Sequence, residues 1–402
     1  MSEEKLKIGL PDQGIIRYYV YSFLELLPTT VDIVPYNDHI QISSYNIVKN
    51  YKEAFEIISQ RISKVKDKYK YKPLIPLSGN DEKIIKKAKK ELGLSEAADI
   101  DEMFQEYVRK LENRQYSIFD MNNSLYPFAI GTYSLPSIFN IEFYGYTRGA
   151  YFDGRHKIGY SASLHMLMIL LAGYINARCL RFRMGMENIT VLVFPPSSSE
   201  IRGFLIPKIK EIRIPLQDLI EDEANKQNLP AIYPVEALIL WLLINLPEEA
   251  VKNVNLYLIA ISEPKGVNPA SPVADFFIPL RTLYYLMEDL LEVIKFKEKF
   301  YKKEVKEVKG YKDRLNDDLL IPALKYGIIT QRKKADLPYI EEALRYVKLL
   351  FLASQKGRLT ERIELLNLSA RRYLLLKETE KISEANLSLF VSELARALVE
   401  KA

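Results

Sequence analysis

Strand-forming segments occur only in the first two thirds of this chain, and their distribution limits the folds open to it. Residues 188–194 (NITVLVF) and 254–262 (VNLYLIAIS) are continuous apolar runs of strand length, which is typical of strands buried within a sheet. After the loop at 264–272 no strand pattern follows, whereas helical patterns continue to the last residue. We therefore predict a mixed α/β (α+β) body over residues 1–280 and an all-helical bundle over residues 281–402.

The predicted body also contains helices and one region of different character. Residues 15–27 and 46–69 carry apolar side chains at helical spacing. Residues 161–179 are so apolar that a helix there must be buried on most of its faces. Residues 116–160 are rich in Tyr, Phe, Asn, Gly and Ser with little helical periodicity, so we expect an aromatic and basic loop region with short strands.

Basic residues are only slightly in excess, so their distribution matters more than their number. The chain has 57 Lys and Arg against 52 Asp and Glu, a formal net charge of +5. Residues 64–90 contain ten lysines. They include a turn followed by a predicted helix, for which Asn80 or Asp81 is the expected N-cap.

Three stretches offer groups that a polyanion requires, namely cations for phosphates and aromatic faces on which bases stack. Taken one at a time, each is better explained as a solvated surface, but together they favour nucleic acid. In these three stretches the residues predicted to contact it are Lys72, Asn80, Lys83 and Lys87 in the lysine-rich stretch, Arg148, Arg155, His156 and Lys157 in the aromatic loop region, and Arg332, Lys333, Arg371 and Arg372 in the helical part. Two further predicted contacts, Arg181 and Arg183, cluster at the end of the apolar helix.

The sequence offers no recognised catalytic motif: it has no phosphate-binding loop, dinucleotide fingerprint, nucleophile elbow or HExxH pair. Cys179 is the only cysteine, which excludes a cysteine-based zinc site within the chain. Of the three histidines, His165 is expected in the core and His39 in a solvated turn. Asp153 and His156 form a conceivable acid–base pair, but no nucleophile or metal set accompanies them. We predict no catalytic residue, no metal and no cofactor.

The same features indicate a cytoplasmic protein without a membrane partner. A single thiol fits a reducing compartment, and the first residues lack the apolar core of a signal peptide. The longest apolar stretches, 164–175 and 237–246, are too short to span about 30 Å of hydrocarbon. Abundant Ile, Lys, Glu and Tyr resemble the usage of thermophiles.

Taken in order, these segments resemble the large subunit of archaeal type I-A CRISPR interference (Cascade) complexes, the Cas-eight-type family. Four features carry the resemblance: the early apolar helix followed by VDIVPYNDH, the segment PLIPLSGNDEKIIKKAKKELG, the aromatic loop leading into IGYSASLHMLMILLAGYINARCLRF, and the all-helical C-terminal part. They span most of the chain, and none is a diagnostic motif by itself.

The resemblance implies a non-catalytic, nucleic-acid-binding subunit that acts in antiviral defence. Such a subunit lies near the 5′ handle of the CRISPR RNA and beside the backbone and small subunits. It helps recognise the protospacer-adjacent motif (PAM) in target double-stranded DNA, holds the displaced strand and helps recruit the helicase-nuclease. RNA pairing then reads most of the target, while protein reads a short duplex motif.

Two other hypotheses remain open from the sequence. A structural scaffold of another assembly would bind partners without contacting nucleic acid, and changes at Lys83 or Arg148 would leave that binding intact. A metal-dependent nuclease would need divalent ions and would lose activity without Asp153 or His156. The binding subunit is favoured because the loops offer cations and aromatic residues rather than converging carboxylates.

Overall fold

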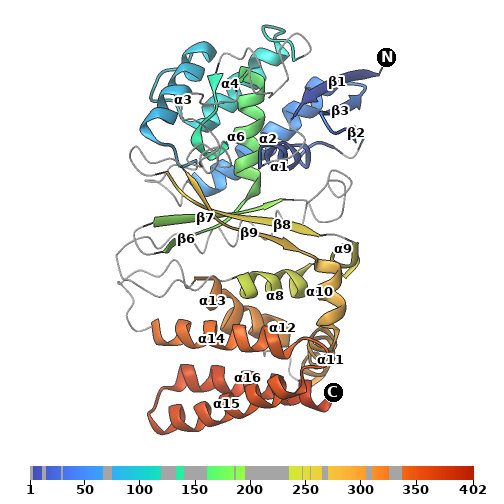
Figure 1. Cartoon of the computed structure of the whole chain (residues 1–402), viewed down its shortest axis with the longest axis vertical. Coiled ribbons are helices and arrows are strands. Elements are labelled where there is room, and N and C mark those ends of the chain that lie inside the picture. The colour runs from blue at the N-terminus through green and yellow to red at the C-terminus, as the bar shows by residue number, and fades with distance from the viewer. Residues whose placement is uncertain are drawn as a thin grey trace, which may run out of the picture. The chain divides into compact units, whose positions relative to one another are not determined.

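The fold is described from a computed structural model of the whole chain (Figure 1). The residues that it describes are 3–10, 15–28, 30–66, 75–118, 133–139, 161–184, 187–194, 235–246, 248–253, 255–264, 270–304, 310–325 and 337–402.

The chain forms two compact units that alternate along the sequence. The first consists of Met1–Leu180, Glu187–Asp218 and Leu256–Phe277, and the second of Arg181–Met186, Leu219–Asn255 and Ile278–Ala402. The division into two domains at residue 280 stays a prediction from the sequence.

A small antiparallel sheet opens the first unit. It contains β1 (Glu4–Gly9), β2 (Asp32–Pro35) and β3 (His39–Ser44), in the order β1-β3-β2. Leu6 pairs with Ile42 and Ile8 with Ile40, and all four side chains are buried. Their alternation with exposed residues such as Lys5 and Lys7 gives the sheet one apolar face and one polar face.

Helices cover most of the first unit's core. They are α1 (Ile15–Leu24), α2 (Ile47–Lys66), α3 (Gly79–Leu92), α4 (Ile100–Glu112) and α6 (Leu164–Ala177). Every residue of α6 is buried, as its apolar sequence predicted. Helix α6 packs against α1 so closely that Gly173 leaves no room for a side chain beside Tyr19.

Further strands complete the described structure of the N-terminal part. A two-stranded pair joins β4 (Tyr133–Ser134) and β5 (Ser161–Ala162), and the short helix η1 (Ser137–Phe139) follows β4. The four-stranded sheet has the order β6-β7-β8-β9, with β6 (Arg178–Met184), β7 (Glu187–Phe194), β8 (Leu256–Ser262) and β9 (Ser271–Ile278).

Two of these four strands correct the sequence-based interpretation. The predicted strands correspond to β7 and β8, which pair antiparallel with Val191 opposite Ala260. Strand β9 lies where the strand pattern was expected to have ended. The sequence gives a weak strand signal there, because SPVADFFI has a proline at its second position and includes an aspartate. Strand β6 follows α6 at once, so Arg181 and Arg183 belong to a strand rather than to a cluster at a helix end.

From residue 280 onward every described element is helical, which confirms a mixed N-terminal part followed by a helical C-terminal part. The helices are α10 (Leu280–Leu286), α11 (Glu288–Glu304), α12 (Tyr311–Arg314), the π-helix η3 (Leu315–Leu320), α13 (Ile321–Lys325), α14 (Leu337–Ala353), α15 (Leu359–Glu378) and α16 (Ile382–Glu400). Helices α8 (Val235–Asn245) and α9 (Glu248–Asn253) belong to the same unit.

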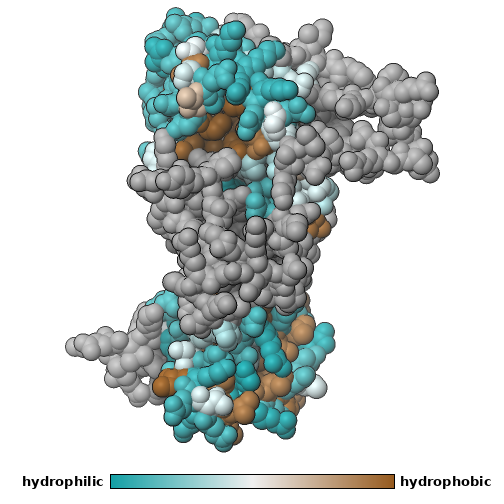
Figure 2. Space-filling view, turned by 90° about the vertical axis from the view of Figure 1, so that its left-hand side faces the viewer, coloured by the Kyte–Doolittle hydropathy of each residue, from teal (hydrophilic) through white to brown (hydrophobic). Residues whose placement is uncertain are grey.

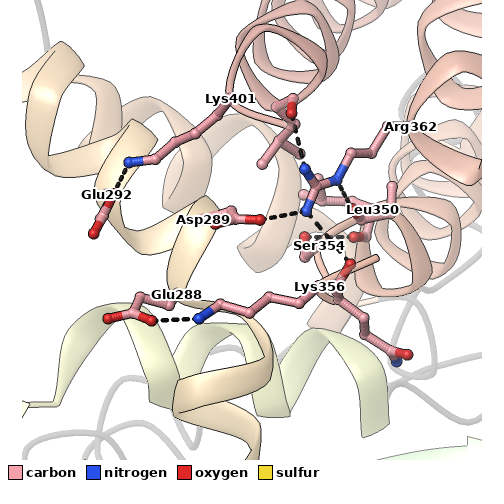
Figure 3. A network of polar contacts seen from close by, with 11 residues as sticks. Glu288, Asp289, Glu292, Leu350, Ser354, Lys356, Arg362 and Lys401 are labelled. Atoms are coloured by element: carbon pink, nitrogen blue, oxygen red, sulfur yellow. Dashed lines mark hydrogen bonds and ion pairs between the residues drawn. The ribbon is translucent and has the colours of Figure 1, made fainter. Parts of the chain in front are cut away.

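A buried arginine holds several of these helices together (Figure 3). Arg362 of α15 is 1% exposed and donates to the backbone oxygens of Ala353 and Leu398, each at 3.0 Å. It also pairs with the carboxylate of Asp289 on α11 at 2.6 Å. The guanidinium thus links the ends of α14 and α16 with α11, and its charge is compensated within the fold.

Candidate nucleic-acid interface

Helix α3 is the described element that carries most of the predicted lysine-rich site. Ser78 is its N-cap and accepts a hydrogen bond from the backbone N–H of Asp81, whose carboxylate accepts one from the N–H of Ser78 in return. This corrects the expectation that Asn80 or Asp81 would cap the helix. The Ser-x-x-Asp spacing of a capping box was the signal that identifies Ser78.

The buried carboxylate of Asp81 also fixes α3 to a distant segment. It accepts hydrogen bonds from the backbone N–H of Ser137 at 2.9 Å and from the Ser137 hydroxyl at 2.7 Å. Asp81 is 4% exposed, so these bonds lie inside the fold. They hold the start of the helix against η1 and so determine the direction in which its exposed face points.

Four lysines share that exposed face. Lys83, Lys86, Lys87 and Lys90 are all exposed and occupy positions i, i+3, i+4 and i+7 of α3. Lys83 and Lys90 are about two helical turns of 5.4 Å apart, and Lys86 and Lys87 lie between them. We refer to these four residues as the α3 lysine stripe. Sequence reasoning named Lys83 and Lys87 but missed Lys86 and Lys90, which the helical spacing identifies.

The lysines of the stripe differ in how far their charge is already compensated. Lys86 pairs with Glu96 at 2.8 Å, and this contact raises the pKa of Lys86 and lowers that of Glu96. Lys87 lies over the ring of Tyr133, with its Nζ 5.2 Å from the ring centroid. Among the described residues, Lys83 and Lys90 have no ion pair. Asn80 is exposed at the first turn of the same helix.

Tyrosines beside the stripe are engaged within the protein rather than presented to solvent. Tyr133 is 1% exposed and donates its hydroxyl proton to the carboxylate of Glu91. Tyr116 donates to the backbone oxygen of Glu91 at 3.2 Å, and Lys110 lies over its ring. Burial raises the pKa of both tyrosines. This surface therefore suits contact with phosphates better than stacking of bases.

The two predicted arginines of the helical part lie on α15 and have different surroundings. Arg372 is half-buried, and its guanidinium pairs with Glu342 at 3.6 Å and with Glu384 at 3.9 Å. Arg371 is exposed, and no described residue forms an ion pair with it. Arg372 is thus engaged in packing α15 against α14 and α16, whereas Arg371 is available at the surface.

The remaining predicted contacts lie outside what the structure describes. The side chains of Arg181 and Arg183 are outside the described part of β6. The other members of this group are outside entirely: Lys72, Arg148, Arg155, His156, Lys157, Arg332 and Lys333.

The described part of the chain contains no cluster of three or more His, Cys, Asp or Glu side chains suited to a metal ion. His39 is the half-buried first residue of β3 rather than part of a solvated turn as expected, with its Nδ1 2.7 Å from Asp38 and its ring stacked on Tyr36. His165 is completely buried on α6, where burial lowers its pKa to about 3 and its Nδ1 forms a short hydrogen bond with the hydroxyl of Tyr107. His165 is therefore a core residue, as predicted. Asp153 and His156 are outside the described residues.

Within the described residues, no helix combines the length and the apolar character needed to cross a bilayer.

Comparison with known proteins places the chain in a family. No curated protein matches it. The family model of the CRISPR-associated protein CsaX matches residues 40–312, which is more than half of the 402-residue chain. The match includes the whole of α3 and confirms the CRISPR association that the resemblance implied. The chain therefore belongs to the family of the CRISPR-associated protein CsaX.

Proposed function

We propose that this protein is a non-catalytic, nucleic-acid-binding large subunit of a CRISPR RNA-guided DNA surveillance complex. In this role it helps recognise the PAM and holds target DNA, close to the 5′ handle of the guide RNA and to the backbone and small subunits. It acts by binding, and a separate helicase-nuclease cleaves the target.

The observation that carries the proposal is the α3 lysine stripe on a CRISPR-associated chain. Four exposed lysines on one helical face provide cations along roughly 10 Å, a length comparable to several phosphates of duplex DNA. The helix is fixed in place by the buried Asp81–Ser137 contacts, so its cations are positioned before DNA arrives. Because Tyr133 is buried and Tyr116 is engaged with Glu91 and Lys110, we assign this surface to the DNA backbone rather than to base edges.

The experiment is a salt titration of DNA binding by the guide-loaded complex. The triple variant Lys83→Gln, Lys87→Gln and Lys90→Gln should weaken binding about equally on all sequences. It should reduce the slope of log affinity against log salt by about three, because each lost phosphate contact removes about 0.9. The measurement is fluorescence anisotropy with labelled duplexes that contain or lack a PAM.

The control is a second triple variant that removes the same number of positive charges from a different surface. Lys299, Lys377 and Lys381 are exposed lysines of the second unit, and their replacement by Gln should leave the salt slope unchanged. An equal loss in both triple variants would assign the effect to net charge alone. Assembly of the complex with unchanged DNA affinity in the α3 triple variant would remove the stripe from the interface and favour a scaffold role.

A further inference from the structure

Helix α15 has an apolar face that no other described element covers. Leu359, Ile363 and Leu374 lie on one side of the helix, and Leu359 and Leu374 are 47% and 60% exposed. Half-buried Leu366 and Ala370 complete the same row at spacings of three and four residues. These five residues are called the α15 apolar row. The α16 residues Ile382 and Leu389, and Leu375 of α15, add exposed aliphatic surface to the same hairpin.

This row is distinct from the face by which α15 joins its own unit. The buried residues of α15 are Arg362, Leu365, Ser369 and Leu376, and the helix packs against α14 and α16. The helix therefore has two apolar faces, one buried within its own unit and one exposed, and an exposed apolar face of this kind is typical of an interaction surface. Hydrophobic residues are visible among hydrophilic ones on the surface of the C-terminal part in Figure 2. Helix α15 carries more exposed large hydrophobic side chains than any other described helix.

Two opposite charges border the apolar row on the same edge. Glu364 and Arg371 are seven residues apart, two turns of the helix, and both are exposed. Neither has an ion pair among the described residues, although nearby charges do: Arg358 pairs with Glu361 at 2.9 Å, and Arg372 pairs with Glu342. A second helix that packs on the apolar row can provide ion-pair partners for both this acid and this base.

An identical helix satisfies it through two-fold symmetry. When two copies of α15 lie antiparallel, an axis midway between Glu364 and Arg371 brings Glu364 of each copy to Arg371 of the other, so that two ion pairs form. About the same axis, Ile363 of one copy lies opposite the gap between Ala370 and Leu374 of the other. Apolar side chains then interdigitate as knobs into holes.

We propose that α15 is a self-association surface, at which two copies of this chain pair antiparallel through the α15 apolar row and the reciprocal Glu364–Arg371 contacts. The contact requires nothing from the α3 lysine stripe, because α3 belongs to the other unit. It also accounts for the exposure of Arg371, whose place beside an apolar row suits a protein partner better than a displaced strand.

The test is the mass of the full chain in solution by analytical ultracentrifugation over a range of micromolar concentrations. The wild type should dimerise. Glu364→Arg alone and Arg371→Glu alone should each weaken the dimer at least about tenfold, because two like-charge contacts replace two ion pairs. Leu374→Glu should do the same by placing a charge in the apolar row.

The most specific test mixes the two charge-reversal variants in one sample. Glu364→Arg mixed with Arg371→Glu should restore a dimer of one copy of each, since one ion pair then forms with its native signs and the other with the signs exchanged. Reversal of Glu341 and Arg345, exposed on α14, is the control and should leave the dimer intact. Circular dichroism verifies that each variant is folded.

A wild type that stays monomeric throughout would overturn the proposal. So would a dimer that none of the α15 changes affects, or an α15 surface whose changes abolish binding of a different protein instead. None of these outcomes bears on the salt titration of DNA binding, so the two proposals fail independently.

Discussion

Gly173 lies where helix α6 packs against α1, and its missing side chain allows the two backbones to approach. A Cβ at this position would come within 2.0 Å of the Tyr19 carbonyl oxygen and 2.8 Å of its carbonyl carbon. Because the obstacle is backbone, the helices must separate to admit even a methyl group.

We therefore expect Gly173→Ala to lower the free energy of unfolding by about 1–3 kcal/mol. Urea denaturation of the full chain measures the change. Gly79→Ala is the matched control, because no atom lies within 4 Å of the position its Cβ would take. Equal stability of the two variants would contradict the close approach of α6 to α1.

His165 makes the stability of the first unit depend on pH. The residue is completely buried, and the rings of Tyr51 and Tyr107 surround it at 5.2 and 6.0 Å between centroids. Burial lowers its pKa from 6.5 to about 3, so the folded protein keeps the imidazole neutral. An unfolded chain takes up a proton below pH 6.5. The stabilising effect is therefore complete above that pH and is lost as the pH falls toward 3.

At pH 5 this single residue should cost about 2 kcal/mol of stability relative to neutral pH. The measurement compares urea unfolding at pH 7 and pH 5 for the wild type and His165→Gln, which should lose less on acidification. His39→Gln, at the first residue of β3, should behave as the wild type does. A pH dependence that survives in His165→Gln would assign it to another group.

At the scale of elements, the guanidinium of one residue, Arg362, connects three helices of the C-terminal part. Arg362 reaches the last residue of α14, the C-terminal turn of α16 and the first turn of α11 (Figure 3). Lys356 and Lys401 add ion pairs to Glu288 and Glu292 of α11, but these are exposed. Exposed pairs contribute at most about 1 kcal/mol each, whereas a buried one is costly to break.

Arg362→Met should therefore destabilise the helical part by about 3 kcal/mol, because it leaves Asp289 and two carbonyl oxygens without their donor. Arg358→Met removes an exposed arginine of the same helix region that pairs with Glu361, and it should cost less than about 1 kcal/mol. Thermal unfolding followed by circular dichroism distinguishes the two. Similar effects of both changes would show that burial gives Arg362 no special role.

Elements differ in how well their sequences predict them. Helix α6 and strands β7 and β8 can be predicted from the length of their apolar segments alone. Each is buried on most sides, so nearly all of its residues are apolar. Strand β9 and strand β6 do not, since a proline and an aspartate interrupt one and the other continues directly from a helix. The lysines of α3 were recognised by their density, but only the helical spacing of Lys86 and Lys90 reveals a continuous face.

At the scale of the molecule, the proposed DNA contact and the proposed self-association belong to different compact units. The α3 lysine stripe belongs to the first unit and the α15 apolar row to the second. The sequence predicted the mixed and helical parts and part of the lysine stripe. It did not predict the Glu91–Tyr133 contact or the charge pairs of Arg372, because these join residues distant along the chain.

The proposed function requires that this chain acts in a complex that contains guide RNA. The most direct measurement is to purify the tagged full-length chain from its native cells and to sequence the RNA that accompanies it. We expect short RNAs that share one constant 5′ handle, recovered together with a repeated backbone protein. Recovery of the chain without such RNA, alone or with unrelated proteins, would contradict the claim.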